Sequence, residues 1–277
     1  GLLDHPNVTA RAYQALGNAY DFNNQPAKAI ETYEKGLKRF PDAGELYLER
    51  GNMDLFKKDY ENALSYYEQG IKLDPKFPSN YYWASKLYYS SSEEVWGMIY
   101  GEIFMNLERN SKRTAEISKL LFDTYKSGIQ FTSDTSMTVS FSQSIILDSE
   151  ALKESGKFKL PFGTGCYEMN LMLALVGESK VDLASLDRIR TGFLERYFGG
   201  DNAKDYPNAL FNFQKTVKNA GHLEAYNYWV LMKGDEEGFR NWRSKNEGKW
   251  TSFVDWFTKN GLELDYFNRF YRLQYKS

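Results

Sequence analysis

The sequence predicts a mainly α-helical fold whose first part repeats a pair of helices. Two stretches of similar pattern carry this prediction: NQPAKAIETYEKGLKRFPD at 24–42 and KKDYENALSYYEQGIKLDP at 57–75. Their prolines, Pro41 and Pro75, lie 34 residues apart. A fixed period of this length is the signature of stacked helical repeats. Helical patterns separated by short breaker segments return in the second half, which extends the helical prediction along the chain.

Residues 10–43 and 44–77 align without a gap, and each copy predicts two amphipathic helices. Large and small residues recur three or four positions apart on one face of each predicted helix. The helices are expected at 10–21, 26–38, 44–56 and 60–72.

Small residues at matching places predict how the two helices of a copy pack. In the first copy, Gly17 with Ala29 lets the helices approach closely, and aromatic residues one turn away fill the groove beside them. The second copy repeats the pair as Gly51 and Ala63. The proline that closes each copy lacks an amide hydrogen, so it ends the helix and redirects the chain into the next copy.

The two copies resemble the tetratricopeptide repeat (TPR) family. The first copy keeps the family's large, small and proline positions, here Tyr13, Leu16, Gly17, Tyr20, Ala29, Tyr33, Gly36 and Pro41. The second keeps Tyr47, Gly51, Ala63, Tyr67, Gly70 and Pro75 but departs from the family at Arg50 and Asp54. The resemblance implies a TPR-type α-α superhelix over about residues 10–110, whose concave groove binds a peptide or protein partner.

A third, degenerate copy is expected at 78–110. Its small and aromatic positions stay in register at Tyr81, Ala84, Ser85, Tyr88 and Gly97. The match then fails, because Gly101 stands at an aromatic position and Arg109 at the proline position. At least about three repeats are usually needed to bury a continuous core. A further amphipathic helix at 114–131 is expected to shield the apolar side of this unit.

Past residue 130 the period disappears. Residues 136–147 alternate apolar and hydroxyl side chains, which predicts a strand. Its expected partner is 156–165, giving a small β-hairpin near 135–162 in which Pro161 favours an edge position. Helices are expected at 166–176, 183–198, 207–219, 223–232, 236–246 and 248–259, with Asp182 and Asp235 as N-terminal caps. The predicted segments are therefore a repeat region with its following helix, 1–130, and a mostly helical region, 131–277, interpreted as further helical pairs or a continued degenerate solenoid.

Composition excludes several classes of function. The chain has 35 Lys and Arg against 37 Asp and Glu, so its net charge is −2 and nucleic-acid binding is not expected. No apolar run reaches the roughly 18–20 residues that a membrane span requires. The single cysteine excludes an internal disulfide. The many Tyr and Asn residues and the start at Gly1 resemble exported bacterial TPR proteins, which implies an exported or cell-envelope location and a trimmed N-terminus.

No catalytic, cofactor or metal site is expected. The two histidines, His5 and His222, have no second histidine or cysteine at metal-ligand spacing. The stretch FGTGC at 162–166 precedes an apolar helix, so its glycines could hold an anion and Cys166 could be an activated thiol. A tight turn followed by a buried small thiol is the favoured interpretation.

By the register of the family, the first helix of each copy lines the groove. The groove-facing residues that this implies are Gln14, Asn18, Asp21 and Phe22 in the first copy, Leu48, Asn52, Leu55 and Phe56 in the second, and Tyr82, Lys86 and Tyr89 in the third. Amide side chains can bond the backbone of an extended peptide, while rings and leucines supply apolar pockets. The alternative is that the C-terminal half of the chain covers this groove.

Some members of the family hold the C-terminal carboxylate of chaperones in a clamp of lysines, asparagines and an arginine. At the clamp positions this chain has Gln14, Asn18, Glu49, Ser79 and Trp83. Only Asn18 agrees with the clamp, and Glu49 would repel a carboxylate. A chaperone tail is therefore not the expected partner.

Two other classes of function stay open beside a non-enzymatic interaction scaffold, which the sequence favours. A carbohydrate-binding surface is suggested by Tyr81, Tyr82, Trp83, Tyr88, Tyr89, Trp242, Trp250, Trp256 and Phe257. These rings also recur at the helical spacing of core residues, which favours packing. An enzyme would need a site near 162–168, where no catalytic constellation is visible.

Overall fold

The structure is a computed structural model that describes residues 3, 5–133, 136–143 and 160–275. Helices make up 71% of it and pack in consecutive pairs, with one small antiparallel sheet among the described residues. The predicted fold class is confirmed. The chain forms two compact units, of which the first comprises residues 1–87 and 263–274 and the second comprises 88–262 and 275–277.

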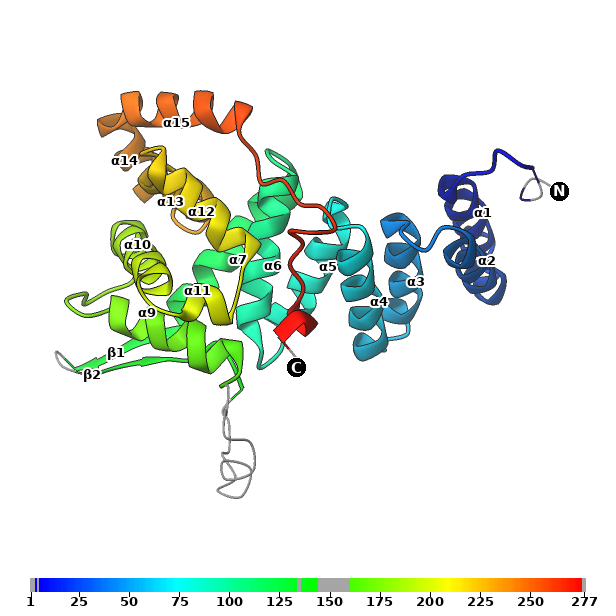
Figure 1. Cartoon of the computed structure of the whole chain (residues 1–277), viewed down its shortest axis with the longest axis horizontal. Coiled ribbons are helices and arrows are strands. Elements are labelled where there is room, and N and C mark those ends of the chain that lie inside the picture. Colours follow the sequence, from blue (N-terminus) through cyan, green and yellow to red (C-terminus); the bar gives the residue numbers. More distant parts are fainter. Residues whose placement is uncertain (1–2, 4, 134–135, 144–159, 276–277) are drawn as a thin grey trace, which may run out of the picture. The chain divides into compact units, whose positions relative to one another are not determined.

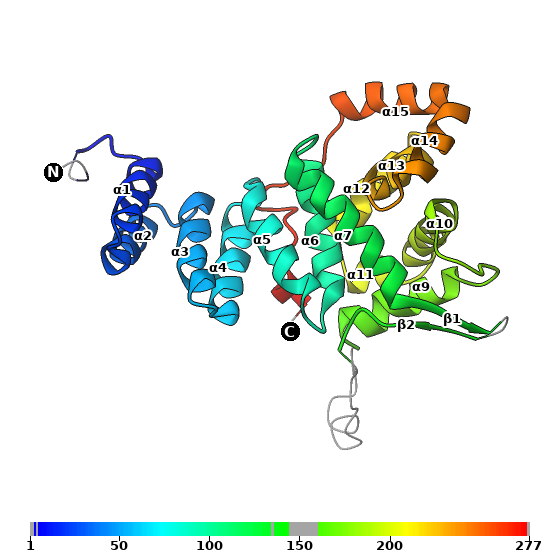
Figure 2. The same ribbon diagram turned by 180° about the vertical axis from the view of Figure 1, so that it is seen from behind.

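The first unit is a stack of helix pairs. Its helices are α1 (Ala10–Phe22), α2 (Pro26–Arg39), α3 (Gly44–Phe56) and α4 (Tyr60–Leu73), followed by α5 (Pro78–Tyr89), whose last two residues belong to the second unit. Helix α1 packs against α2 and α3 packs against α4, while α3 also contacts α1 and α2 (Figures 1 and 2). The first four helices confirm the predicted ones to within one residue at each end.

The loop inside each helix pair has the same conformation in both repeats. Asn24 and Lys58, 34 residues apart, adopt the left-handed conformation with φ of 56° and 63°. The N–H of each donates to the carbonyl three residues earlier, Asp21 or Leu55, at 2.9 Å. A left-handed residue just after a helix ends it and turns the chain. The period of the sequence is therefore repeated in the backbone geometry.

Glycines make room for rings from the partner helix of each pair. A Cβ added to Gly17 would lie 2.1 Å from the Tyr33 ring. A Cβ added to Gly51 would lie 2.5 Å from the Tyr67 ring. Because no side chain fits in either place, glycine at these two positions is what admits the tyrosines.

The step from one repeat to the next uses a second pair of glycines. A Cβ on Gly36 would lie 2.7 Å from Leu46 Cδ1, and one on Gly70 would lie 2.2 Å from Asn80 Nδ2. Asn80 is fully buried at the start of α5 and donates to the carbonyl of Gly44 at 3.0 Å. Helix α5 therefore continues the stack in the same register.

The C-terminal segment 263–274 also belongs to the first unit and contacts α4. Arg272, at the start of the short helix η3 (Arg272–Tyr275), donates to both carboxylate oxygens of Glu68 at 2.9 and 3.0 Å. Glu68 is only 5% exposed, and Phe270 in the same segment is fully buried. Arg272 and Glu68 are 204 positions apart, so no local sequence pattern predicts this ion pair.

The second unit is organised around α6 and α13. Its helices are α6 (Glu94–Leu107), α7 (Lys112–Gly128), η2 (Phe162–Glu168), α9 (Met169–Ala174), α10 (Leu183–Gly199), α11 (Asn202–Asp205), α12 (Ala209–Asn219), α13 (Leu223–Leu231), α14 (Glu236–Lys245) and α15 (Glu247–Lys259). Helix α6 is buried from Val95 to Asn106, and α13 contacts α7, α10, α12 and α15. Because α6 and α7 pack with later helices, the compact units differ from the predicted segments 1–130 and 131–277.

The predicted helices and caps of this half are confirmed, with α11 as an addition. Asp182 accepts from the N–H of Ser185, and Asp235 accepts from the N–H of Gly238, each at 2.8 Å. The helix predicted at 166–176 begins earlier, at Phe162, with a π-helical turn. Among the described residues, no helix combines the length and the apolar composition needed to cross a bilayer.

The small sheet differs from the prediction in its pairing. Strand β2 (Ser136–Val139) confirms the first part of the strand predicted at 136–147, whereas residues 140–143 are not in a strand and 144–147 lie outside the described residues. The antiparallel partner of β2 is β1 (Ile129–Ser133). The predicted partner 156–165 is wrong, since Phe162–Glu168 is helical, while residues 156–159 lie outside the described part. The helix predicted to reach residue 131 ends at Gly128, where a Cβ would lie 2.2 Å from the ring of Phe141.

Candidate functional site

Four polar side chains from α1 and α3 form one hydrogen-bonded group in the first unit. Glu49 Oε1 accepts from Gln14 Nε2 at 2.9 Å and from Asn18 Nδ2 at 3.5 Å. Glu49 Oε2 accepts from Asn52 Nδ2 at 3.2 Å. We call Gln14, Asn18, Glu49 and Asn52 the Glu49 cluster. Three of its members are residues predicted to face the groove, and the structure brings them together around a carboxylate.

Tyrosines of the second helices fix the orientation of two of these amides. Tyr33 donates its hydroxyl to Asn18 Oδ1 at 2.6 Å, and Tyr67 donates to Asn52 Oδ1 at 2.9 Å. Burial raises the pKa of both tyrosines, and the nearby charge of Glu49 raises it further. The hydroxyls therefore stay protonated and remain donors. Each asparagine oxygen is held by a tyrosine, so its NH₂ group points toward Glu49.

The charge of Glu49 is not matched by a cation within the described residues: no lysine or arginine lies within ion-pair distance of it. The neighbouring Arg50 pairs instead with Glu34 at 3.2 Å and Asp54 at 2.7 Å. Glu49 is half-buried. The cluster is therefore a negative centre that neutral amides hold in place.

Two phenylalanines stand exposed at equivalent positions of the two repeats. Phe22 ends α1 and is 92% exposed, and Phe56 ends α3 and is 75% exposed. Each lies one helical turn beyond the asparagine of its repeat. The other predicted residues of these two helices, Asp21, Leu48 and Leu55, are half-buried. The exposed rings are the largest apolar contacts that α1 and α3 offer a partner.

The third helix, α5, differs from the first two. Tyr82 is buried, and the ammonium of Lys86 lies 5.3 Å from its ring centroid and 5.4 Å from that of Trp83. Tyr89 belongs to the second unit, where its hydroxyl is buried close to Gly101. Of the three residues predicted here, only Lys86 offers a polar group that is not buried.

Reasoning from the sequence missed the roles of Tyr33, Tyr67 and Glu49. The tyrosines carried a signal, because they repeat at the same interval as Asn18 and Asn52. The sequence identified Glu49 only as a charge that would repel a carboxylate. Its bonds to Gln14, Asn18 and Asn52 were not predicted, since Ala15 and Trp83 stand at its equivalent positions.

The segment 162–168, where the sequence would place an enzyme site, is buried at Phe162, Gly163, Cys166 and Tyr167 and half-buried elsewhere. The Cys166 side chain is a thiol with no exposed surface. The two glycines of this segment allow close packing. A Cβ on Gly163 would lie 2.0 Å from Ser142 Oγ, and one on Gly165 would lie 2.3 Å from Leu160 Cβ. Over the described ranges, no three His, Cys, Asp or Glu side chains are grouped so that they could hold a metal ion.

The aromatic residues that suggested a sugar-binding surface pack into the interior or half-way into it. Tyr81, Tyr82, Tyr88, Trp242 and Phe257 are buried, and Trp83, Tyr89, Trp250 and Trp256 are half-buried. Trp242 stacks on Tyr228 with ring centroids 4.2 Å apart. This placement favours the packing interpretation of these rings.

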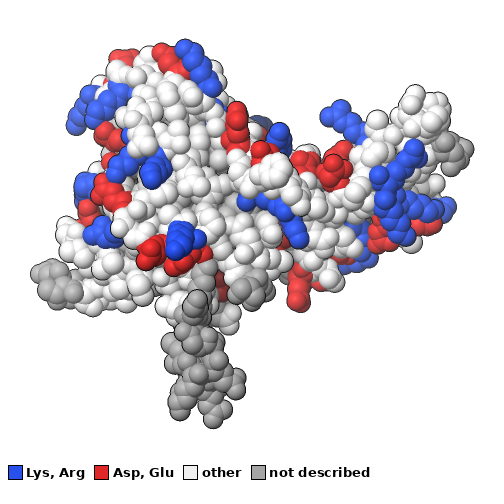
Figure 3. Space-filling model, viewed as in Figure 1, with Lys and Arg blue, Asp and Glu red and all other residues white. Residues whose placement is uncertain are grey.

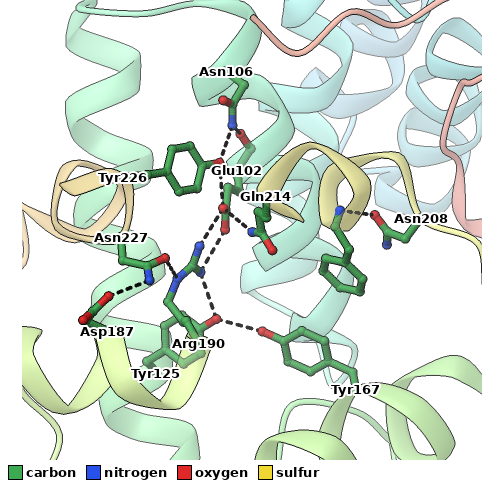
Figure 4. Close-up of polar contacts among 11 residues, drawn as sticks. Glu102, Asn106, Tyr125, Tyr167, Asp187, Arg190, Asn208, Gln214, Tyr226 and Asn227 are labelled. Carbon is green, nitrogen blue, oxygen red and sulfur yellow. Dashed lines mark hydrogen bonds and ion pairs between the residues drawn. The ribbon is translucent and has the colours of Figure 1, made fainter. Parts of the chain in front are cut away.

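A buried ion pair forms the polar centre of the second unit (Figure 4). Arg190 donates to both carboxylate oxygens of Glu102 at 2.7 and 2.9 Å, with side chains only 7% and 4% exposed. Gln214 and Tyr226 donate to the same carboxylate at 2.6 and 2.9 Å. Arg190 Nε donates to Asn227 Oδ1 at 2.8 Å. Burial alone would lower the pKa of Arg190, but the Glu102 charge raises it above its usual value, so Arg190 stays protonated.

This Glu102–Arg190 network leaves no room for a substrate. The cavity beside it has a volume of about 20 Å³ and is lined by the ion pair, Tyr125, Tyr167 and apolar side chains. Such a space holds about one water molecule. The network joins side chains of α6, α10, α12 and α13.

Comparisons with known proteins agree with the repeat geometry. Two family models, each described as a tetratricopeptide repeat, match residues 10–53 and 44–77. Together they cover the two helix pairs of the first unit and end before α5. No curated protein matches the chain.

Proposed function

Residues 10–77 are tetratricopeptide repeats, and from this premise we propose that the first unit binds an extended peptide segment of a partner protein. Repeats of this family generally mediate protein–protein interaction. The proposed surface is the face of α1 and α3 that carries the Glu49 cluster with Phe22 and Phe56. We call it the first-helix face.

The proposal rests on a pair of residues, an asparagine and a phenylalanine one helical turn apart, that occurs in both repeats. Asn18 and Phe22 lie one turn apart on α1, and Asn52 and Phe56 occupy the same places 34 residues later on α3. An amide NH₂ has two hydrogens, and each asparagine uses one for Glu49. The second hydrogen is available to a carbonyl of a bound backbone. An extended chain that crosses both repeats would meet the same donor and the same ring twice.

The exposed rings supply the apolar part of the proposed contact. Phe22 and Phe56 keep 92% and 75% of their surface exposed within the folded chain. The C-terminal segment 263–274 makes its Arg272 ion pair with Glu68 on α4, the second helix of its repeat. Within the first unit, this segment therefore leaves the two rings exposed. Aromatic anchors of this kind carry much of the free energy of binding at protein interfaces.

Charge favours a protein partner over a nucleic acid. The net charge is −2. On the face of the molecule seen in Figure 3, basic and acidic side chains are interspersed. A nucleic-acid surface would need a clustered basic patch.

The proposal is tested with a phage-displayed random peptide library selected on the whole chain. Peptides that bind are labelled, and their affinity is measured by fluorescence anisotropy. The variant Phe22→Ser/Phe56→Ser should weaken binding by at least about tenfold. Tyr266→Ser/Phe267→Ser removes two exposed rings of the C-terminal segment, 63% and 94% exposed, and is the matched control. Equal affinities for both variants, or a library that yields no binders, would contradict the proposal.

A further inference from the structure

We infer that Glu49 determines which peptide the first-helix face accepts, and that the bound peptide places a lysine or arginine side chain on its carboxylate. The inference rests on the peptide-binding function proposed above and names the chemistry of the partner. It starts from the unmatched charge of Glu49 in the middle of the proposed surface.

Glu49 is held in place without being neutralised. Its three donors, Gln14, Asn18 and Asn52, come from both helices of the face and are neutral amides. The tyrosine bonds to the two asparagines hold these donors in turn. A carboxylate that is positioned before binding loses little side-chain entropy when a partner arrives. The cluster is therefore prepared for a charged ligand.

Two strongly buried carboxylates of the chain are matched by arginines from distant positions. Glu68 pairs with Arg272, and Glu102 pairs with Arg190. Glu49 differs, because no cation of the described chain reaches it and the adjacent Arg50 is turned to Glu34 and Asp54. A half-buried charge attracts a counter-charge more strongly than one in bulk water does. The missing counter-charge is the one we assign to the partner.

The free lone pair of the carboxylate sets the geometry of this contact. An ionised carboxylate offers about four acceptor positions. Oε1 already accepts from Gln14 and Asn18, while Oε2 accepts only from Asn52. The incoming ammonium or guanidinium is therefore expected to donate one charge-assisted hydrogen bond to Oε2. A lysine or an arginine can do this equally, because the contact is not bidentate.

The same cluster disfavours a metal ion as the occupant. Ca²⁺ requires six to eight oxygen ligands. The amide oxygens of Asn18 and Asn52 are taken by Tyr33 and Tyr67, and both NH₂ groups point toward Glu49. Too few oxygens face the carboxylate to complete a metal shell. An organic cation needs only the one acceptor.

The two exposed rings define the neighbours of the basic residue in the peptide. Phe22 and Phe56 lie one turn from Asn18 and Asn52, on the two helices that hold Glu49. The peptide is expected to carry a basic residue with apolar residues near it, so that the rings contact apolar groups or the methylene stem of the basic side chain.

The test repeats the peptide selection on the wild-type chain, on Glu49→Gln and on Glu49→Lys. Glu61→Gln on α4 makes the same change of charge at an exposed glutamate and is the matched control. Wild-type and control selections should enrich lysine or arginine at one position of the peptides. Replacing that residue by norleucine should weaken binding to the wild type about tenfold but hardly change binding to Glu49→Gln. Glu49→Lys should select aspartate or glutamate instead.

The salt dependence of binding gives a second readout. The affinity of a basic peptide for the wild type should fall as sodium chloride rises, and this fall should be smaller for Glu49→Gln. The inference would be overturned by selected peptides that show no preference for lysine or arginine and bind Glu49→Gln as tightly as the wild type. If binding of these peptides still requires Phe22 and Phe56, the proposed binding function is retained. A selection without binders, or with binders indifferent to both phenylalanines, would overturn both.

Discussion

Tyr33 donates its hydroxyl to Asn18 at 2.6 Å, and one repeat later Tyr67 does the same to Asn52 at 2.9 Å. The bond joins the second helix of each pair to the first. It therefore links the packing of a repeat to the polar groups that, in the proposed function, the repeat presents to a partner. The same tyrosine rings fill the space that Gly17 and Gly51 leave open.

Removing one of these hydroxyls should cost stability and binding together. Tyr33→Phe deletes the donor to Asn18, so we expect the free energy of unfolding of the first unit to fall by about 1 kcal/mol. Asn18 is then free to rotate, and peptide affinity should fall as well. Urea denaturation followed by circular dichroism measures the first effect. Tyr60→Phe, at a 53% exposed ring, is the control. Losses equal to those of the control would show that the bond has no such role.

A methyl group at Gly17 should disrupt the first helix pair. In Gly17→Ala the new Cβ meets the Tyr33 ring, since the available separation is 2.1 Å. Overpacking of this kind costs about 1–3 kcal/mol, although alanine is the better helix former. Gly248→Ala on α15 has nothing within 4 Å of its Cβ and should be neutral or stabilising. Thermal melts of the two variants compare them directly. A Gly17→Ala protein as stable as Gly248→Ala would be incompatible with the packing described.

The Glu102–Arg190 pair should behave as a coupled unit. Arg190→Met leaves a buried carboxylate without its cation, and we expect a loss of about 3–5 kcal/mol in the second unit. The double variant Glu102→Leu/Arg190→Met removes both charges and should lose less than the sum of the single changes. The matched surface pair is Lys218–Glu195, with side chains 36% and 56% exposed. Breaking it with Lys218→Met should cost no more than about 1 kcal/mol. A double-mutant cycle that gives additive losses at Glu102 and Arg190 would refute the coupling.

Asp187 should make the second unit more stable at lower pH. Burial raises the pKa of this carboxyl above its usual value of 3.8, and the hydrogen bond from Asn227 only partly opposes the shift. A raised pKa means that the folded state holds the proton more tightly than the unfolded chain. The stabilisation is complete below the unfolded pKa and is lost as the pH rises through the folded one. Asp187→Asn keeps an acceptor for Asn227 and removes the charge.

This variant should therefore be more stable than the wild type at pH 7. The difference should shrink as the pH falls and vanish near the pKa of an unfolded aspartate, about 3.9. Unfolding curves at several pH values measure this difference. A constant difference across that range would contradict the assignment.

The 34-residue period made the first unit predictable. Helices α1 to α4 follow from it because each copy repeats the spacing that packs a helix pair, with Gly17 and Gly51 at equivalent places. Side-chain chemistry at helix starts was equally local, so Asp182 and Asp235 were identified as caps. The asparagines of the proposed site came from the register of the repeats.

Features that depend on distant residues were not predictable in this way. Strand β1 follows α7 directly, so its short alternation was hidden in the end of a helical pattern. Arg190 lies 88 residues from Glu102, and no local spacing relates the two. Glu49 breaks the repeat, since neither neighbouring copy has a carboxylate at its position. A repeat period predicts only residues that recur in each copy, and Glu49 occurs in one copy alone.

The central claim, that a peptide lies across α1 and α3, is tested most directly by site-specific photocrosslinking. A photoreactive benzoylphenylalanine replaces Phe22, Phe56 or, as a control, the exposed Phe267, and a selected peptide is added before irradiation. Mass spectrometry then locates the crosslinks. We expect peptide crosslinks from positions 22 and 56, at different residues of the same peptide, and none from position 267. Crosslinks from position 267 alone, or none from positions 22 and 56 to a peptide that binds, would contradict the claim.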